Sequence, residues 1–523
     1  MAKGYRRVDR DQQFLLPPDM REWLPEGHPV WLVIEAVRLL DTSVFHARRK
    51  TGGAGAAGYD PDMLVTLLIW AYANGITSSR RIERLCGQDV AFRVVCAGQL
   101  PDHVTVARFR QQFAETAVAL FAQVLVLCAR LGMGKAGTVA LDGTKIAASA
   151  SKDANRTEDG LRKLARELAA RHAETDADED ALFGAGRGDD DPGDPATRRE
   201  RVAAALASLQ AERREQQEAE RAAADRHLQA ARAGTPPGGR PPAGAEVEAA
   251  RLRLERETAA ARARAEDWQR RKAAAAGSGT GRRPVPPQRS ARVARADARL
   301  EAALAREAAR AQKDNQDRAC AVRNVTDPGS RLMPVRGGGF IQGYNAQNAV
   351  SDDGLIIATR LTDDTTDTRW YEPMTSDAIA AAAAMAAAAG GGAGIGLVLA
   401  DAGYLSGHNL TCDGPDRLIA TGQRRHLEKR AREADGGADR EEPGGAIAAM
   451  AGRLATPEGI AAYRQRGRIA ETPHARIKHN MRFRQLSVRG IRRASGEWTF
   501  TCAVHNIMLA ITSGHLTPAA LAG

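Results

Sequence analysis

Aromatic residues, cysteines and long apolar runs are all scarce in this sequence. Aromatic residues make up 4% of the chain, and the six cysteines include no Cys-x-x-Cys pair, so we expect reduced, mostly buried thiols. The basic N-terminal residues are not followed by an apolar stretch, so we do not expect a secretory signal peptide. The longest apolar stretches, 63–73 and 117–129, are too short to span a bilayer and are expected to be core helices of a soluble protein.

Positive charge exceeds negative charge. The chain has 523 residues, with 75 Lys and Arg against 64 Asp and Glu, which gives a net charge of +11. This length is enough for two to four domains and at least one large core. The charge favours a polyanionic partner, although a basic balance alone is only weak evidence for nucleic-acid binding.

Residues 1–135 are predicted to form a helical domain. Apolar residues recur at helical spacing over 29–40 and 60–71. Short basic helices are expected over 80–86 and 106–113, and the second of these carries Arg108 and Arg110. Short basic helices joined by tight turns are found in helix-turn-helix DNA readers and also in many compact helical domains, so both interpretations stay open here.

Residues 151–319 differ in composition from the rest of the chain. They are rich in Ala, Arg and Glu and are interrupted by the Pro/Gly-rich stretches 189–194, 234–242 and 277–287. Thin apolar stripes on otherwise charged segments are formed by Leu161, Leu164, Leu168, Val202, Leu206 and Leu209. This pattern is typical of a coiled-coil-like helical arm with flexible linkers.

Two apolar runs each lead to an aspartate that is followed by a small-residue turn. They are Thr138-Val-Ala-Leu-Asp142-Gly-Thr144 and Gly396-Leu-Val-Leu-Ala-Asp401-Ala-Gly403. We interpret each as a buried strand that ends in Asp. An unpaired buried carboxylate is costly, so each requires a cation, a salt bridge or a hydrogen-bonding turn. A third acid, Glu471, lies in a basic segment that we expect to be helical.

The elements after the arm predict an α/β domain with a mixed sheet. Two strands, 340–350 and 355–361, flank a hairpin signal at 352–354, and an Ala-rich helix follows over 371–389. The Asp401 strand, a strand at 418–421, the Glu471 helix and a final helix around 502–511 complete the order. The predicted domains are a helical domain (1–135), a first catalytic strand (136–150), the inserted arm (151–319) and the remainder of the α/β core (320–523).

Two strand-end aspartates and a helical glutamate can jointly hold two divalent metal ions. Such a pair suits in-line attack on a phosphodiester, and Mg²⁺ needs only a few carboxylates. In this interpretation Asp142 bridges the ions and Asp401 and Glu471 each hold one. Lys478 follows Glu471 by seven residues, so it is expected on the same helix face, toward a substrate phosphate. The alternative is a solvated basic helix with one internal ion pair.

The chain resembles bacterial insertion-sequence transposases of the DDE type, in the branch numbered eleven-eighty-two of the IS-four-like group. The resemblance covers nearly everything except the arm. It rests on Tyr59-Asp-Pro-Asp-Met-Leu64, Ser79-Arg-Arg-Ile-Glu-Arg84, Pro101-Asp-His-Val-Thr-Val-Ala-Arg-Phe-Arg110, Leu141-Asp-Gly-Thr-Lys145, Asn324-Val-Thr-Asp-Pro328, Gly343-Tyr-Asn-Ala-Gln347, Ala400-Asp-Ala-Gly-Tyr404 and Glu471-Thr-Pro-His-Ala-Arg-Ile-Lys478.

The resemblance implies an RNase H-like catalytic core with Asp142, Asp401 and Glu471 as the metal-binding triad. It also implies two Mg²⁺ ions, with Mn²⁺ as a substitute. The signature of this family around the glutamate is Tyr, two residues, Arg, three residues, Glu, six residues, Lys. Tyr463, Arg466, Glu471 and Lys478 fit it with one additional residue between Arg and Glu.

The resemblance implies a cytoplasmic, nucleoid-associated enzyme that binds the terminal inverted repeats of an insertion sequence and joins their ends to target DNA. DNA contacts are expected from Tyr463, Arg466 and Lys478 and from Arg108 and Arg110. Synapsis of two ends favours a homodimer. Two alternatives remain, a nuclease of the same fold without strand transfer and a non-catalytic DNA-binding relative. His474 and His479, which flank this region, could also touch DNA; a metal role for either needs partners that the sequence does not reveal.

Overall fold

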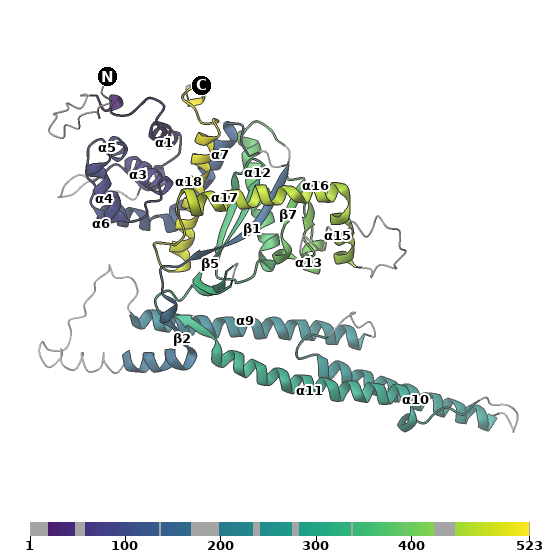
Figure 1. Ribbon diagram of the computed structural model, residues 1–523. Coiled ribbons are helices and arrows are strands. Elements are labelled where there is room, and N and C mark those ends of the chain that lie inside the picture. Colours follow the sequence, from purple (N-terminus) through teal and green to yellow (C-terminus); the bar gives the residue numbers. More distant parts are fainter. Residues whose placement is uncertain are drawn as a thin grey trace, which may run out of the picture. The chain divides into compact units, whose positions relative to one another are not determined.

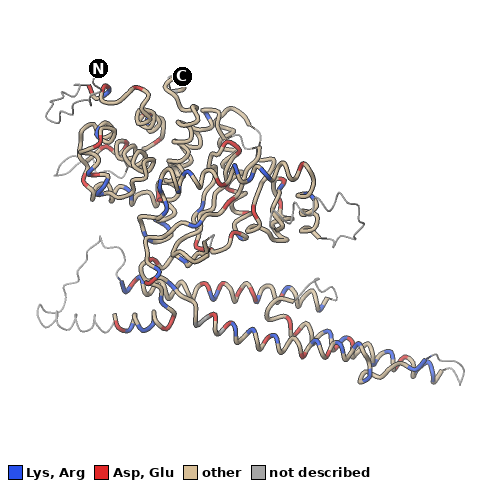
Figure 2. Tube along the Cα trace, in the orientation of Figure 1, with Lys and Arg blue, Asp and Glu red and all other residues tan. Residues whose placement is uncertain are grey.

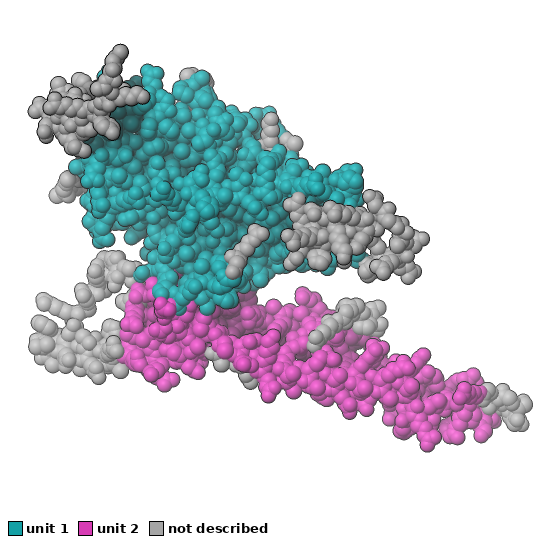
Figure 3. All heavy atoms as spheres, in the orientation of Figure 1, with its two compact units in different colours: residues 1–152, 329–523 teal, residues 153–328 magenta. Residues whose placement is uncertain are grey.

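The computed structural model describes residues 19–47, 58–134, 137–168, 198–233, 241–274, 282–335, 338–392, 394–422 and 445–521. The chain divides into two compact units, coloured separately in Figure 3. Unit 1 comprises Met1–Lys152 and Gly329–Gly523, and unit 2 comprises Asp153–Pro328. The predicted linker 189–194, and parts of the other two linkers, lie outside the described residues.

The N-terminal part of unit 1 is helical, as predicted. Its elements are η1 (Met20–Glu22), α1 (Pro29–Arg38), α2 (Ser43–His46), α3 (Pro61–Ala73), α4 (Ser79–Gln88), α5 (Val90–Val95), α6 (His103–Gln111) and α7 (Phe113–Arg130). Aspartates cap several of these helices. The side chain of Asp60 accepts from the backbone N–H of Asp62 ahead of a proline at the first position of α3, and Asp102 accepts from the N–H of Thr105 in α6.

The helix α7 is longer than the apolar stretch that predicted it. It has 18 residues, and by length and composition alone it could cross a membrane. Core helices pass the same test, and α7 packs along the C-terminal helix α18 (Ile491–Thr512) with residues such as Leu120 and Val124 buried. The stacked rings of Phe113 and Phe500 join the two helices, with centroids 4.1 Å apart. These contacts explain why α7 is apolar.

A mixed six-stranded sheet forms the centre of unit 1 (Figure 1). Its strands are β1 (Thr138–Ala147), β4 (Arg331–Pro334), β5 (Phe340–Ser351), β6 (Ile356–Thr362), β7 (Leu397–Ala400) and β8 (Asp416–Ile419). The order is β4-β5-β1-β7-β8, and β6 also pairs with β5. The pairs of β5 with β1, β4 and β6 are antiparallel, whereas β1 with β7 and β7 with β8 are parallel. The predicted hairpin and the predicted mixture of parallel and antiparallel strands are therefore confirmed.

The prediction that the first strand ends at Asp142 is wrong. β1 continues to Ala147, so Asp142 lies in mid-strand, opposite Asn348 of β5. Gly143 makes no turn; it pairs with Gln347 within the sheet. A Cβ at this position would lie 2.5 Å from Oδ1 of Asp367, so close approach of that side chain, and not turn formation, explains the glycine.

Helices cover this sheet. The remaining elements of unit 1 are η4 (Thr368–Trp370), α12 (Tyr371–Ala388), η5 (Ala402–Tyr404), α13 (Gly407–Thr411), α15 (Ala446–Ala455), α16 (Pro457–Arg466), η6 (Gly467–Glu471), α17 (Thr472–Ala475), η7 (Arg476–Asn480), α18 and α19 (Pro518–Leu521). The helix α7 packs against α12 and α18, and both α12 and α18 contact β6. The helix α16 contacts β7, and η6 contacts β1 and β5. The predicted final helix around 502–511 is found, but α18 begins at Ile491, and its buried residues extend back to Ala494.

Unit 2 consists of long helices and one short strand pair. The long helices are α9 (Arg198–Arg232), α10 (Glu246–Ala274) and α11 (Ala291–Cys320), and the described residues 158–168 are also helical. η2 (Lys152–Ala154) and η3 (Pro287–Arg289) are short turns. β2 (Asn155–Thr157) pairs antiparallel with β3 (Val322–Asn324). Positively and negatively charged residues are interspersed along these helices (Figure 2). Leu161, Val202 and Leu209 of the predicted stripe are buried together, and α10 packs against α11. A coiled-coil geometry stays a prediction.

Candidate active site

Asp142 and Asp401 lie on neighbouring parallel strands. Ala140 of β1 pairs with Leu399 of β7, so the same register continued by two residues places Asp142 opposite Asp401. The chain turns at once after Asp401, whose Oδ1 accepts from the N–H of Gly403 at 2.9 Å. Because side chains at matching positions of paired strands point to the same face, the two carboxylates project together.

One guanidinium nitrogen joins these two carboxylates. Nη2 of Arg466 lies 2.5 Å from Oδ1 of Asp142 and 3.4 Å from Oδ2 of Asp401. The Asp142 and Arg466 side chains are only 14% and 13% exposed, whereas that of Asp401 is 39% exposed. Positive charge between two carboxylates reduces the repulsion that would otherwise oppose burying them side by side.

The two carboxylates have pKa values shifted in opposite directions. Burial alone would raise the pKa of Asp142, but the hydrogen bond from His474 and the charge of Arg466 outweigh it and lower this pKa. Burial raises the pKa of Asp401, and the Arg466 charge only partly offsets it because Asp142 adds negative charge nearby. The pKa of Arg466 is raised, since the charges of Asp142 and Asp401 outweigh the opposing effect of burial.

A buried hydrogen-bond chain leads from Trp498 to Asp142. The indole Nε1 can only donate, and it bonds Oγ1 of Thr359 at 2.8 Å. Thr359 in turn donates to Oδ1 of Asn348 at 2.6 Å, which leaves the Asn348 amide nitrogen facing Nε2 of His474 at 3.0 Å. Nε2 is therefore the acceptor, so Nδ1 carries the proton and donates to Oδ2 of Asp142 at 3.1 Å. The sequence did not reveal a partner for His474; in the structure its partners are Asn348 and Asp142.

The segment that carries Glu471 is tied to both aspartate strands. The hydroxyl of Tyr463 donates to the carbonyl of Ala400, directly before Asp401, at 3.2 Å. Nζ of Lys478 donates to Oγ1 of Thr144 at 2.5 Å and to the carbonyl of Lys145 at 3.0 Å, both on β1. Tyr463 and Lys478, which the sequence suggested as DNA contacts, therefore fix this segment against β7 and β1.

A π-helical turn accommodates the additional residue of the family signature. η6, Gly467–Glu471, is π-helical and starts directly after Arg466. In an α-helix, side chains four apart share a face, whereas a π turn bonds residues five apart. The five-residue step from Arg466 to Glu471 therefore keeps both side chains on one side of the helix. A second π turn, η7, carries Lys478. Such turns occur frequently at functional sites.

Glu471 is the exposed member of the predicted triad. Its backbone ends η6, its side chain faces solvent, and its charge contributes to the raised pKa of Arg466. The structure thus brings Asp142 and Asp401 together through Arg466 and places Glu471 within electrostatic reach of the same guanidinium.

A fourth carboxylate, Asp367, lies beside this group and was missed in the sequence. Its Oδ1 accepts from the side-chain amides of Asn345 at 2.7 Å and Gln347 at 2.6 Å, and it faces Nζ of Lys145 at 3.7 Å. Its carboxylate also lies against Gly143 and Gly403, the small residues that follow Asp142 and Asp401. In the sequence, Asp367 ends a polar stretch, Asp363-Asp-Thr-Thr-Asp367. The composition of this stretch is that of an ordinary solvent-exposed loop, so it gave no signal of a site.

Arg108 and Arg110, the predicted DNA contacts of the N-terminal helices, lie in different surroundings. Arg108 is exposed and lines a small cleft with Phe45 and Tyr59. Arg110 is half-buried and donates to the carbonyl of Thr77 and, at 3.3 Å, to Oγ of Ser79.

The donor set at the aspartate pair fits a divalent metal ion. Carboxylate oxygens are the ligands that Mg²⁺ and Mn²⁺ prefer, and Asp142 and Asp401 already converge on one positive group. Nε of Arg466 is buried without a hydrogen-bond partner among the described residues. Another group of potential ligands, His46, Asp60 and Asp62, is explained by hydrogen bonds and helix capping in the N-terminal helices.

Comparison with known families supports the same interpretation. Residues 18–112 match the family described as transposase domain (DUF772), and residues 440–509 match the family described as transposase DDE domain. The second match includes Tyr463, Arg466, Glu471 and Lys478. No curated protein and no solved structure matches the chain. Members of the DDE family generally use divalent metals. Together, the two matches support a bacterial transposase of the DDE type.

Proposed function

We propose that this chain binds the terminal inverted repeats of an insertion sequence, cuts at the element's ends and joins the 3′-hydroxyl ends to target DNA. One observation carries the proposal. Asp142 and Asp401, from neighbouring parallel strands, meet at one guanidinium that belongs to the Glu471 segment. We further propose that unit 1 has an RNase H-like core and that the chain belongs to the eleven-eighty-two branch of the IS-four-like group.

Asp142, Asp401 and Glu471 would hold the divalent ions, Mg²⁺ or Mn²⁺. The chemistry that two such ions supply is activation of the attacking oxygen and stabilisation of the leaving oxygen. Nε of Arg466 is buried and has no hydrogen-bond partner among the described residues, so this guanidinium has one donor that the protein does not use. The hydrogen bond from Nδ1 of His474 to Oδ2 would hold the Asp142 carboxylate in one orientation.

Lys145 has a further place in this arrangement. Burial lowers the pKa of its ammonium, and the charges of Asp367, Asp401 and Asp142 act in the opposite direction. Nζ of Lys145 lies 3.7 Å from Oδ1 of Asp367 and donates to the Thr365 carbonyl at 3.1 Å, so these two groups hold the ammonium beside the aspartate pair. The protein would act as a homodimer, because joining two DNA ends requires two active sites. It would act in the cytoplasm, at the nucleoid.

A joining assay separates the transposase from a nuclease of the same fold. A duplex that carries the element's end with a free 3′-hydroxyl is incubated with supercoiled plasmid and Mg²⁺. The proposal predicts plasmid products covalently joined to the duplex, and none with an end that lacks the 3′-hydroxyl. Nicked plasmid without joined product would favour the nuclease, and an inert protein that still binds the end would favour the non-catalytic relative.

A further inference from the structure

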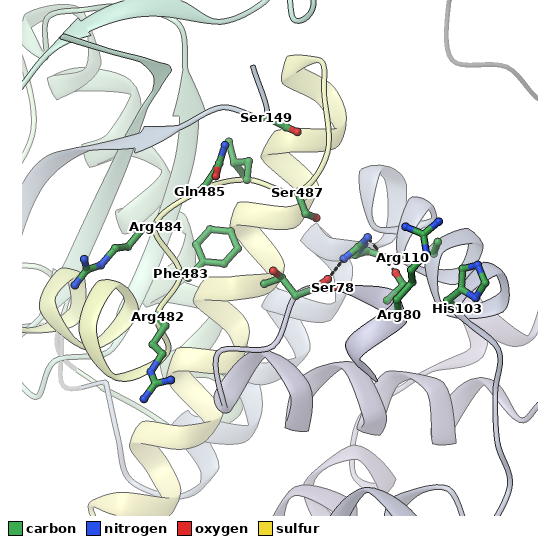
Figure 4. Close-up of a pocket in the computed structure, with 14 residues that line it drawn as sticks. Ser78, Arg80, His103, Arg110, Ser149, Arg482, Phe483, Arg484, Gln485 and Ser487 are labelled. Carbon is green, nitrogen blue, oxygen red and sulfur yellow. Dashed lines mark hydrogen bonds between the residues drawn. The ribbon is translucent and has the colours of Figure 1, made fainter. Parts of the chain in front are cut away.

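Unit 1 contains a cleft whose lining has arginines and no acidic residues. Its volume is about 740 Å³, and the N-terminal helices and the segment after Lys478 line it (Figure 4). Four of its 14 lining residues are arginines and none is acidic. We call this the arginine cleft; its arginines are Arg80, Arg110, Arg482 and Arg484.

Two of these arginines are free to bind a ligand. Arg80 and Arg482 are exposed, and neither has a hydrogen-bond or ion-pair partner among the described residues. The other two shape the walls. Arg110 bonds the Thr77 carbonyl, and Nε of Arg484 donates to the Lys478 carbonyl at 3.1 Å. The acid nearest in sequence to Arg80, Glu83, is engaged by His103 at 2.9 Å.

The rest of the lining suits phosphate oxygens. Five lining residues are serine or threonine: Thr77, Ser78, Ser79, Ser149 and Ser487. The helix α4 begins at Ser79, in the wall of the cleft, and its N-cap side chain, Ser78, makes no capping hydrogen bond. Hydroxyl groups and the open first turn of a helix add neutral donors to the arginine charge.

The backbone holds Arg482 in place. Arg482 has a φ of 51°, in the left-handed region, and packs against Gly75 of the N-terminal part, where a Cβ would lie 3.0 Å from that of Arg482. A strained residue that persists in a structure is usually held there by its surroundings. The arginine is therefore presented from a fixed position.

The cleft is connected to the active site along β1. The N–H of Leu486 donates to the Ala147 carbonyl at 2.8 Å, and Nε2 of Gln485 donates to the Ala148 carbonyl at 2.9 Å. Ala147 follows Asp142 by five residues of one strand, which corresponds to about 17 Å. Along one strand of DNA this distance spans about five nucleotides at 3.4 Å each.

We propose that the arginine cleft binds the phosphate backbone of duplex DNA whose scissile phosphate lies at Asp142 and Asp401, starting about five nucleotides from that phosphate. This inference rests on the proposed function. The contact is to phosphate, so it positions the DNA without reading its sequence.

The first test measures the salt dependence of binding to a duplex of random sequence. In the double variant Arg80→Gln/Arg482→Gln, the negative slope of log K against log salt should become shallower by about 1.8, because each lost phosphate contact contributes about 0.9. The control Arg130→Gln removes an exposed charge outside the cleft and should leave the slope unchanged. Both side chains of the double variant are exposed and unpartnered, so its melting temperature should match that of the parent.

An unchanged slope in the double variant would overturn the cleft assignment. If that protein also retains cleavage that depends on Asp142, the proposed function stands and only the cleft fails. If the parent binds no DNA at any salt concentration, both fail.

The second test locates the contact on an end duplex whose cleavage position is known. Single phosphates are replaced by neutral methylphosphonates along each strand. The parent should lose affinity at positions that begin about five nucleotides from the scissile bond. The double variant should be insensitive there and unchanged elsewhere. Equal sensitivity in parent and variant would place the contact on another surface.

Discussion

Arg466 should be the residue on which the stability of the aspartate pair depends. It is the described side chain that contacts both Asp142 and Asp401, at 2.5 and 3.4 Å. Arg466→Ala leaves Asp142, whose side chain is 14% exposed, with His474 as its remaining side-chain partner. Removing one partner of a buried ion pair typically costs about 3–5 kcal/mol, because an uncompensated charge stays behind.

The expected loss is about 3 kcal/mol, at the lower end of that range. Asp401 is 39% exposed, so water screens its charge, and its contact with Arg466 adds little. The matched control is Arg464→Ala, which removes an exposed arginine two positions earlier on α16 and should change stability by less than about 0.5 kcal/mol.

Urea unfolding followed by tryptophan fluorescence measures this effect, because Trp498 is fully buried in the hydrogen-bond chain that ends at Asp142. Combining Arg466→Ala with Asp142→Asn should recover about 2 kcal/mol of the expected additive loss, since both charges are then gone. If Arg466→Ala costs no more than Arg464→Ala, or if the double variant is simply additive, the guanidinium does not compensate Asp142 and the reasoning is refuted.

Three further outcomes follow from the same geometry. The pKa of Asp142 is lowered, so its carboxylate stabilises the fold above the usual pKa of about 3.9, and this stability is lost on acidification. The pKa of Asp401 is raised, so its stabilising contribution is present below a pH of about 3.9 and is lost as the pH rises. At pH 7, Asp142→Asn should therefore destabilise by about 1–2 kcal/mol, while Asp401→Asn should stabilise by less than about 1 kcal/mol, and urea titrations showing the same sign for both would contradict this account. Gly143→Ala should cost about 1–3 kcal/mol because its Cβ would meet Asp367 at 2.5 Å, whereas Gly137→Ala, with nothing within 4 Å, should be nearly neutral by the same measurement. Asp367→Asn should weaken the hold on Lys145, so that its ammonium competes with Mg²⁺ for Asp142 and Asp401. The Mg²⁺ concentration for half-maximal cleavage should then rise about tenfold, which corresponds to about 1.4 kcal/mol. An unchanged Mg²⁺ concentration for half-maximal cleavage would show that Asp367 does not act at this site.

Local patterns in the sequence were sufficient to predict most elements of the α/β core. The hairpin of β5 and β6 follows from apolar strands around an Asp-Asp-Gly turn, and α12 follows from a run of alanines. The position of Asp401 after β7 was also correct, because a short apolar strand followed by Asp and small residues is a local signal. The end of β1 was misplaced because a glycine required by close packing has the same appearance as a turn glycine.

Contacts between distant segments could not be predicted. His474 reaches Asp142 across 332 positions of sequence, and its tautomer depends on a chain that starts at Trp498. Asp367 gains its position from amides on β5. The π turn that realigns Arg466 with Glu471 has no composition signal, because it depends on how the helix is fixed to β7 and β1 by Tyr463 and Lys478.

The most direct test of the active-site assignment compares cleavage with binding on one end duplex in Mg²⁺. The parent is measured beside the isosteric variants Asp142→Asn, Asp401→Asn and Glu471→Gln, with Arg464→Ala as a folded control. The account predicts that each of the three variants loses cleavage by at least about a thousandfold while its affinity for the duplex stays within about threefold of the parent. Cleavage at the parental rate by any of the three would show that this residue is not part of the metal-binding site.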